Sequence, residues 1–381
     1  MQTRKLYYED PFQKGFASAV VSCEETKGGY AVVLEETAFY PEGGGQPCDV
    51  GTLGSANILD VREKDGVIVH LCDRPLTAGA SVSGKIDWAR RFDHMQQHSG
   101  EHICSGLICA RFHCDNVGFH MGADTVTIDF NADISWEELL EIEQTANRYI
   151  YEDHPIDIQF HRGAELDKID YRSKKPLEGD VRIVAFPGAD CCACCGTHVA
   201  RSGQVGLVKF LSVQKFRDGV RIEMLAGRRA HRYLSACWEQ DVHVAQALSV
   251  KPTASLAGVE RVLAELSALK LRCARLEESA FAQTAAQYEN KGNVLLFEEE
   301  MGGDSLRKLC DAVTKTCGGR CAVFAGADGA YKYAIGHTDG DLRALTKTLN
   351  AALSGRGGGK PNFVQGSVSA SRAEIEAFFN A

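Results

Sequence analysis

The sequence predicts an α+β protein of several domains, with strands first, then helices mixed with antiparallel strands, and an α/β unit at the end. The chain has 381 residues, which exceeds the usual size of one domain. Its apolar residues alternate over short runs before residue 89 and follow a helical period after it. These changes predict four domains, at residues 1–89, 90–235, 236–290 and 291–381.

Residues 1–89 are predicted to form a small β-barrel. The runs at 30–36 and 57–72 alternate apolar and polar residues, as half-buried strands do. Asp65-Gly66 lies inside the second run and is a two-residue hairpin signal. Antiparallel pairing around this turn follows.

Residues 90–235 are predicted to combine helices with antiparallel strands. From Gln97 to Phe112 the apolar residues recur at helical spacing. A second helix should begin at Ser135, because Ser135 and Glu138 have the spacing of a capping box. The expected strands are the runs VTIDF, PIDIQF, VRIVAF and VGLVKFLSVQKF.

Residues 236–290 are predicted to be a helical connector, with a long charged helix from Pro252 to about Tyr288. Leu269 and Lys270 break its heptad, so a helical hairpin or stalk and a coiled coil are equally compatible with it. Residues 291–381 alternate strand and helix patterns around a hairpin signal at Asp328-Gly329, which predicts an α/β domain.

Composition excludes several classes of protein. The formal net charge of -9 argues against a protein that binds nucleic acid over its whole surface and leaves only local basic clusters. No stretch of eighteen apolar residues and no export signal occurs, so we expect a cytoplasmic protein that does not enter a membrane. In that compartment the fifteen cysteines should be reduced thiols or metal ligands.

Two motifs predict a metal site. His98 and His102 are four residues apart on the expected helix, so their imidazoles share one face; His94 and His98 have the same spacing but lie nearer the start of that helix. Downstream, Cys194 and His198 lie in DCCACCGTHV. Thiolate and imidazole together suit Zn²⁺. Spacing alone leaves other cysteines as alternatives to Cys194, namely Cys191, Cys192 and Cys195.

Other candidates lie near these motifs. Gly43, Gly44 and Gly45 with Gln46 allow a substrate to approach the backbone, although a tight turn without a ligand explains them equally well. Asn116 and Asp129 follow the metal helix and are candidates for the wall of a pocket.

The order of these motifs resembles that in the editing domain of alanyl-tRNA synthetase and its free-standing relatives, the AlaX proteins. HSGEH and CCGTHV match the two halves of the zinc signature, and TAFYPEGGGQPCDVG at Thr37–Gly51 matches the glycine-rich motif that precedes it. GRGGGKPNFVQGS near the end resembles the motif of the synthetase's C-terminal domain, which also occurs in DHH phosphoesterases. The family signature reads CGGTH where this chain has CCGTH.

The resemblance implies a long AlaX protein. It would have a small β-barrel, the editing domain shared with threonyl- and alanyl-tRNA synthetases, a connector and a C-terminal domain of the DHH-associated type, with no aminoacylation domain before them. It implies one Zn²⁺ per chain, held by His98, His102, Cys194 and His198, and ATP-independent hydrolysis of Ser-tRNA(Ala) or Gly-tRNA(Ala). Thr37 matches the family threonine that senses the amino-acid side chain. Gln46, Asn116 and Asp129 complete the expected catalytic set.

The expected partner is mischarged tRNA(Ala), with a homodimer formed through the connector or the C-terminal domain. Basic clusters that would contact tRNA lie at 90–91, 172–175, 215–217 and 227–232. The predicted substrate- and tRNA-binding residues are Gly43, Gly44, Gly45, Arg217, Arg221, Arg356, Gly358 and Lys360.

Two other functions compete with this prediction. A DHH-type phosphoesterase shares the C-terminal motif, but the sequence contains no DHH triplet. A non-catalytic, zinc-stabilised tRNA- or RNA-binding module is the stronger alternative, because four protein ligands close the coordination shell of zinc. Zinc that activates water and zinc that only organises the site both remain open.

Overall fold

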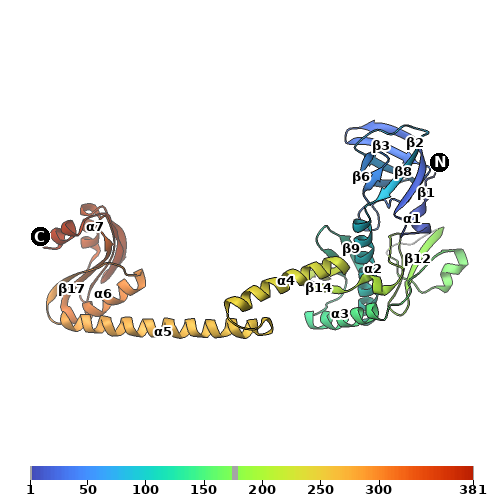
Figure 1. The fold of residues 1–381 in the computed structure, drawn as a ribbon. Helices are drawn as coiled ribbons and strands as arrows, with labels where there is room; N and C mark the ends of the chain where they lie inside the picture. The colour runs from blue at the N-terminus through green and yellow to red at the C-terminus, as the bar shows by residue number, and fades with distance from the viewer. Residues whose placement is uncertain (1, 174–178, 381) are drawn as a thin grey trace. The chain divides into compact units, whose positions relative to one another are not determined.

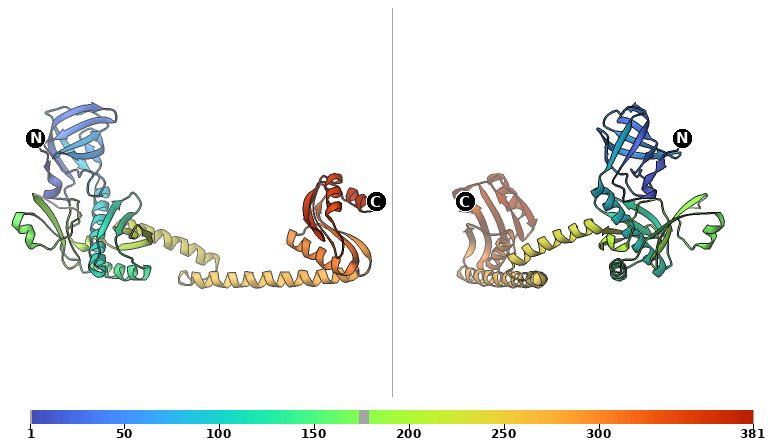
Figure 2. Two further views of the ribbon diagram at one scale, coloured as in Figure 1. Left: turned by 180° about the vertical axis from the view of Figure 1, so that it is seen from behind. Right: turned by 45° about the vertical axis from the view of Figure 1, so that its right-hand side comes forward.

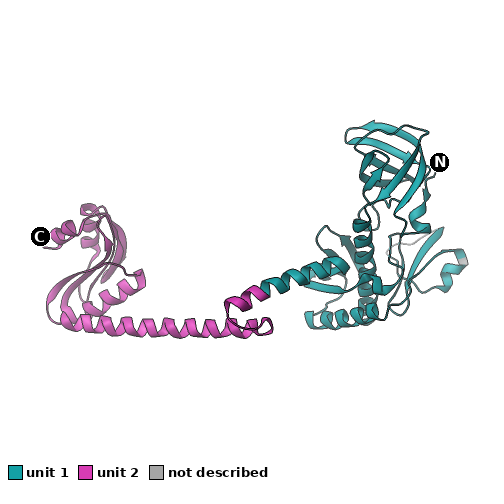
Figure 3. Ribbon diagram, viewed as in Figure 1, with its two compact units in different colours: residues 1–241 teal, residues 242–381 magenta. Residues whose placement is uncertain are grey.

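The computed structural model describes residues 2–173 and 179–380, drawn in Figure 1. The chain divides into two compact units, Met1–Asp241 and Val242–Ala381 (Figure 3). Both contain helices and strands, which confirms the α+β class. Within the described ranges every helix is too short or too polar to span a bilayer. The division into four domains stays a prediction.

The first unit begins with a closed six-stranded barrel, seen at the N-terminal end of the chain in Figure 2. Asp65 and Gly66 both have positive φ, as a type I′ hairpin between β6 and β7 requires. A short helix and a two-stranded pair accompany the barrel: β1 Arg4–Lys5, α1 Leu6–Glu9 and β4 Glu36–Thr37. In barrel order the strands are β2 Gly15–Thr26, β3 Gly29–Leu34, β7 Val67–Cys72, β6 Ala56–Lys64, β5 Gly51–Leu53 and β8 Ser81–Ile86.

Helix α2 follows the barrel directly. It runs from Trp88 to Phe112, so it begins well before the predicted Gln97. The Asp87 side chain caps its N-terminus by accepting from the Arg90 amide, and His113 ends it in the left-handed conformation. Most residues in the middle of α2 are buried, because the helix is covered on several sides by the rest of the unit.

Two sheets and a second long helix surround α2. Helix α3, Trp136–Tyr151, begins with the predicted capping box of Ser135 and Glu138. The four-stranded sheet, in order, contains β14 Val208–Phe216, β15 Gly219–Ala226, β10 Val126–Phe130 and β9 Asn116–Met121. The three-stranded sheet contains β11 Asp157–Arg162, β12 Asp180–Phe186 and β13 Asp190–Ala193, and two 3₁₀ turns lie at η1 Gly163–Lys168 and η2 Ser202–Val205.

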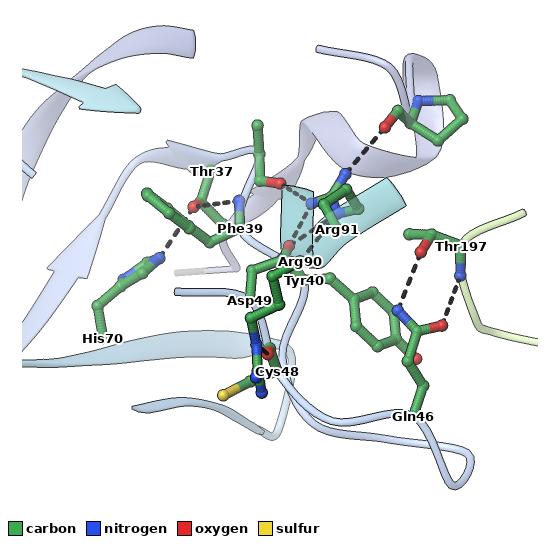
Figure 4. A network of polar contacts seen from close by, with 12 residues as sticks. Thr37, Phe39, Tyr40, Gln46, Cys48, Asp49, His70, Arg90, Arg91 and Thr197 are labelled. Carbon is green, nitrogen blue, oxygen red and sulfur yellow. Dashed lines mark hydrogen bonds and ion pairs between the residues drawn. The ribbon is translucent and has the colours of Figure 1, made fainter. Parts of the chain in front are cut away.

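A buried ion pair fastens α2 to the loop that leaves the barrel. Arg91 and Asp49 are both fully buried, and the Arg91 Nε lies 3.0 Å from Asp49 Oδ1 (Figure 4). The guanidinium also donates to the carbonyl oxygens of Pro11 and Ala38, and Asp49 accepts from the Tyr40 amide. These bonds satisfy both buried charges and fix the 38–49 segment against the helix.

The second unit contains a five-stranded sheet in the order β16-β17-β18-β20-β19, in which only β16 and β17 are parallel. The predicted hairpin at Asp328-Gly329 joins β17 to β18. The glycine-rich run near the end of the chain, Arg356–Lys360, forms strand β19. The elements are α4 Gly227–Ala247, which begins in the first unit, η3 Pro252–Ala254, α5 Ser255–Gln287, β16 Gly292–Glu298, α6 Gly303–Cys317, β17 Gly318–Ala327, β18 Ala330–His337, α7 Arg343–Ala352, β19 Arg356–Lys360, β20 Phe363–Val368 and α8 Arg372–Asn380.

Candidate metal centre

The structure brings the four predicted metal ligands together. His98 and His102 lie one turn apart on α2, while Cys194 and His198 come from the loop after β13. The Cys194 Sγ lies 3.4 Å from His98 Nε2 and 3.7 Å from His198 Nε2. One ligand atom from each residue lies within 4.8 Å of all the others. Ligands placed about 2.0 and 2.3 Å from a tetrahedral ion are about 3.5 Å apart, so the spacing fits Zn²⁺.

An unsatisfied polar atom also indicates that an ion belongs here. Among the described residues, the Nε2 of His102 is buried and has no hydrogen-bond partner, whereas its Nδ1 has one in Asp190. Buried polar groups in folded proteins nearly always have a partner. A metal ion between the imidazoles and the thiolate would supply the partner that His102 Nε2 lacks.

Both helix histidines are oriented through their second nitrogen. The Nδ1 of His98 donates to Gln46 Oε1 at 2.8 Å, and the Nδ1 of His102 donates to Asp190 Oδ2 at 2.8 Å. Arg172 in turn holds Asp190 with two bonds of 2.8 Å. Partners of this kind fix the tautomer that leaves Nε2 free for a metal. Sequence reasoning missed Asp190, although it directly precedes the cysteine cluster, and assigned Arg172 to a basic cluster for tRNA.

Gln46 connects the glycine-rich loop to both halves of the site. Its Oε1 also accepts from the Thr197 amide at 3.1 Å, and its Nε2 donates to the Thr197 hydroxyl at 2.9 Å (Figure 4). Gly196 precedes Thr197 and has no room for a side chain, because a Cβ there would collide with the His98 ring and lie 2.9 Å from Gln46 Oε1. The Gly-Thr pair of CCGTH is thus explained by packing against His98 and Gln46.

The electrostatics suit a thiolate ligand. Burial favours the neutral thiol, but the nearby imidazoles of His98, His198 and His102 outweigh it and hold the pKa of Cys194 well below its usual range. Burial likewise favours neutral His102, yet Cys194 and Asp190 raise its pKa well above the usual value. The Cys194 thiolate and a protonated His102 therefore stabilise one another, and a divalent cation that bound the thiolate would displace the proton from His102.

Cys194 is the cysteine that the structure groups with the three histidines. Cys192 instead lies with His102 and Asp190, in a second group of potential ligand atoms. Neither Cys191 nor Cys195 belongs to either of the groups found among the described residues.

A cavity of about 970 Å³ opens beside these ligands. Three of the four, His98, His102 and Cys194, form part of its wall, and so do the predicted residues Gly44 and Asn116. The remaining wall mixes charged, aromatic and small side chains: Glu101, Asp115, Val117, Phe119, Tyr171, Arg172, Ser173, Asp180, Val181, Arg182, Cys192, Ala193 and Cys195. Sequence reasoning did not single out Glu101, which lies next to a predicted ligand in HSGEH.

Thr37 does not line this cavity. Its hydroxyl is fully buried, donates to His70 Nε2 at 2.9 Å and accepts from the Phe39 amide at 3.1 Å (Figure 4). The His70 Nδ1 donates to the Val32 carbonyl, which leaves Nε2 as the acceptor for Thr37. These contacts hold the hydroxyl within the barrel, and its role in sensing the amino-acid side chain stays a prediction.

Asp129 is also outside the cavity wall. Its carboxylate pairs with Arg221 through bonds of 2.7 and 2.8 Å between β10 and β15. Asp129, which was predicted for catalysis, and Arg221, which was predicted for tRNA binding, thus form an ion pair with each other. Arg217 lies in the turn that joins β14 to β15, with positive φ and its guanidinium over the Phe216 ring.

The glycine-rich loop meets the site at close range. Gly44 has positive φ and open space around its Cα, whereas a Cβ on Gly45 would enter the Phe119 ring. Gly43 pairs with Gln46 across this turn. In the second unit, the predicted tRNA-binding residues Arg356, Gly358 and Lys360 are exposed along β19.

Of the basic cluster at 172–175, Lys174 and Lys175 lie outside the described residues, and Arg172 is engaged by Asp190.

Comparisons with known proteins show which sequences this chain resembles. The profile of "tRNA synthetases class II (A)" matches residues 9–90, and that of the "Threonyl and Alanyl tRNA synthetase second additional domain" matches residues 181–223. The alanine–tRNA ligase of Pyrococcus abyssi is 31% identical over 96% of this chain, which spans 42% of that ligase. The alanyl-tRNA editing protein Aarsd1-A of Xenopus laevis is 27% identical over 93% of this chain and 88% of its own length.

Among solved structures, the C-Ala domain of Aquifex aeolicus alanyl-tRNA synthetase matches 24% of this chain and 90% of its own length, at 20% identity and a TM-score of 0.22.

Proposed function

We propose that this chain is a trans-editing aminoacyl-tRNA deacylase. It is a relative of alanyl-tRNA editing proteins and contains alanyl-tRNA synthetase-type domains. Its substrates would be Ser-tRNA(Ala) and Gly-tRNA(Ala), and one Zn²⁺ per chain would be held by His98, His102, Cys194 and His198. The observation that carries the proposal is the cavity, because three of the four candidate ligands form its wall.

The size and lining of the cavity suit the aminoacyl end of a tRNA. Its volume of about 970 Å³ lies at the upper end of the range for small-ligand pockets, about 300–1,000 Å³. Tyr171 offers an aromatic ring on which a terminal base can stack. Gly44 exposes its backbone there, so a ribose or ester group can approach without a side chain in the way.

The ester to be cleaved would lie between the metal centre and Asn116. A bound Zn²⁺ would supply positive charge that polarises the ester carbonyl or fixes the substrate. Asn116 is buried in the wall and held by Glu101 and Ser105, so its position is defined before a substrate arrives. Gln46 and Asp190 hold the imidazoles, and water reaches the carbonyl through the open cavity.

Editing is needed because a synthetase pocket for alanine discriminates poorly against glycine and serine. A difference of one small group is worth only about 1–3 kcal/mol in a binding site. A second, hydrolytic site on a separate protein removes the errors that remain.

A deacylation assay distinguishes the proposed enzyme from a non-catalytic zinc module. Purified protein is incubated with Ser-, Gly- and Ala-tRNA(Ala), with and without a chelator. We expect rapid loss of the mischarged forms only, and slowing by the chelator. Equal decay of all three at the uncatalysed rate would exclude the deacylase and leave the RNA-binding module.

A second copy of this chain is the partner we propose for helix α5. Its apolar residues recur at alternating steps of three and four. This register places Leu269 at a d position and Lys270 at an e position, so neither residue breaks it. These side chains are exposed, with Leu266 at 46% and Leu269 at 56%. The stripe contains Val259, Val262, Leu266, Leu269, Cys273 and Leu276.

Charges beside the stripe favour a parallel pair. In a parallel coiled coil each g position faces the following e position of the partner. Glu265 would then face Lys270 of the second copy, and Arg272 would face Glu277 of the second copy. Both pairs are of opposite sign.

Sedimentation of two matched variants tests the dimer. Leu266→Glu should give monomers, whereas Leu271→Glu, on the opposite face of α5 and 55% exposed, should not. Dimers of the first variant, or a monomeric native protein, would refute the α5 interface.

For tRNA we propose contacts through exposed basic residues in both units. Arg356 and Lys360 flank Gly358 on the exposed strand β19, and Arg217 and Arg221 lie at one end of the four-stranded sheet. Arg221 already pairs with Asp129, so its contribution should be the smaller one.

A further inference from the structure

Glu101 is a buried carboxylate in the wall of the cavity. It lies on α2 directly before His102 and is 5% exposed. Its Oε1 accepts hydrogen bonds from the Ser105 hydroxyl at 2.6 Å and from Asn116 Nδ2 at 2.7 Å. Both donors are neutral, and one of them, Asn116, also lines the cavity.

This carboxylate has no cationic side chain as a partner in the described part of the chain. The other buried acid near the site, Asp190, is held by Arg172 and His102. The other two acids of the cavity wall, Asp115 and Asp180, are exposed to water. Burying a carboxylate without a cation is costly, and two neutral donors offset only part of that cost.

The metal centre does not account for Glu101. Glu101 is not among the four residues whose ligand atoms cluster there, and His102 already has its orienting carboxylate in Asp190. Within the described ranges the second oxygen of Glu101, Oε2, accepts no hydrogen bond, so one acceptor remains available at the cavity wall.

We propose that Glu101 binds the α-ammonium group of the aminoacyl ester, an inference that rests on the proposed deacylase function. An aminoacyl ester has one cationic group near its reacting carbonyl, and that group is the α-ammonium. Contact with the α-ammonium group would fix the position of the neighbouring ester carbonyl in the cavity. It also defines the substrate class, because peptidyl-tRNA carries an uncharged amide at the same position and cannot form an ion pair.

N-acetylation of the substrate tests this role directly. Deacylation rates are compared for Ser-tRNA(Ala) and N-acetyl-Ser-tRNA(Ala) with the zinc-loaded full-length protein. A hydrogen bond to a charged group corresponds to roughly 10- to 100-fold, and we expect the native protein to prefer the free amine by that factor. Equal rates on both substrates would refute the proposal without any variant.

Glu101→Gln removes the charge and keeps the acceptor for Ser105 and Asn116. We expect it to slow hydrolysis of Ser-tRNA(Ala) by the same factor, leave the N-acetylated substrate unaffected and so abolish the preference. Asp115→Asn, an exposed acid of the same wall, should keep the preference.

The possible failures are distinguishable. If the native protein hydrolyses neither substrate, the deacylase function fails, and the role of Glu101 with it. If Ser-tRNA(Ala) is hydrolysed but Glu101→Gln retains the preference, only the ammonium contact is refuted. Zinc content is measured for each variant, and a loss of zinc in Glu101→Gln would assign the carboxylate to the metal centre and overturn the proposal.

Discussion

Replacing Gln46 with alanine is the sharpest test of how the metal centre is built. The change removes three buried hydrogen bonds, of 2.8 Å to His98 Nδ1 and of 3.1 and 2.9 Å to Thr197. One of the three touches a candidate ligand and fixes its tautomer. Loss of such a partner lowers metal affinity by roughly 10- to 100-fold. The two bonds to Thr197 support the loop that carries His198, and their loss should reduce the free energy of unfolding by about 2 kcal/mol.

Competition with a chromophoric chelator measures the zinc affinity, and thermal unfolding with and without zinc measures stability. Gln96→Ala provides the matched control, because Gln96 is a buried glutamine of α2 that donates only to backbone carbonyls of Gln204 and Val205. It should lower stability but leave zinc affinity unchanged. Gln46→Glu should retain affinity, since its carboxylate still accepts from His98. A change of less than threefold in Gln46→Ala would refute the orienting role.

Three further predictions follow from other contacts. Thr37→Val should lower the free energy of unfolding by about 1–3 kcal/mol, because it leaves the Phe39 amide without its hydrogen-bond partner. The ratio of Ser-tRNA to Ala-tRNA hydrolysis should not change, and a changed ratio would instead support side-chain sensing by Thr37. Burial lowers the pKa of His70 from 6.5 to about 4, so between these pH values the unfolded chain binds more protons than the folded protein. The free energy of unfolding should therefore fall by about 3 kcal/mol as the pH drops from 6.5 to 4 and then level off. Thermal unfolding of a His70→Gln variant should lack this part of the pH dependence. Removing Arg356 and Lys360 together should reduce the salt dependence of tRNA binding by about one unit of slope per charge, and an unchanged slope would exclude them from the interface.

Local patterns predicted much of the secondary structure because their physical cause is local. The capping box at Ser135 and the type I′ turn at Asp65-Gly66 depend on a few neighbouring residues. The start of α2 was missed because its first turns carry polar residues, such as Arg91, whose burial depends on Asp49 far away in the sequence. The strand at 356–360 was missed because glycine has a low β-propensity, and pairing with β20 overrides it.

The same distinction separates the site residues. His98 and His102 are predictable since helical spacing alone brings their side chains to one face. Asp190 and the choice of Cys194 depend on how the 190–198 segment crosses α2, and no spacing rule contains that information. Thr37 and Asp129 have suitable chemistry and a suitable place in the sequence, but His70 and Arg221 take up their polar atoms.

The candidate metal centre is built from three segments of the first unit that lie far apart in the sequence. The barrel-side loop contributes Gln46 and places Gly45 against Phe119. The Phe119 ring stacks on the His98 ring, with 5.0 Å between the ring centroids. Helix α2 contributes two ligands and the 194–198 segment the other two. A metal ion that binds only when all three segments are in place stabilises their joint arrangement by its binding free energy. Removing zinc should therefore weaken the contact between the loop and α2 as well as the site itself. Hydrogen exchange of the Thr197 amide, which donates to Gln46, would report this: faster exchange after chelation is expected, and unchanged exchange would show that Gln46 holds the loop without the metal.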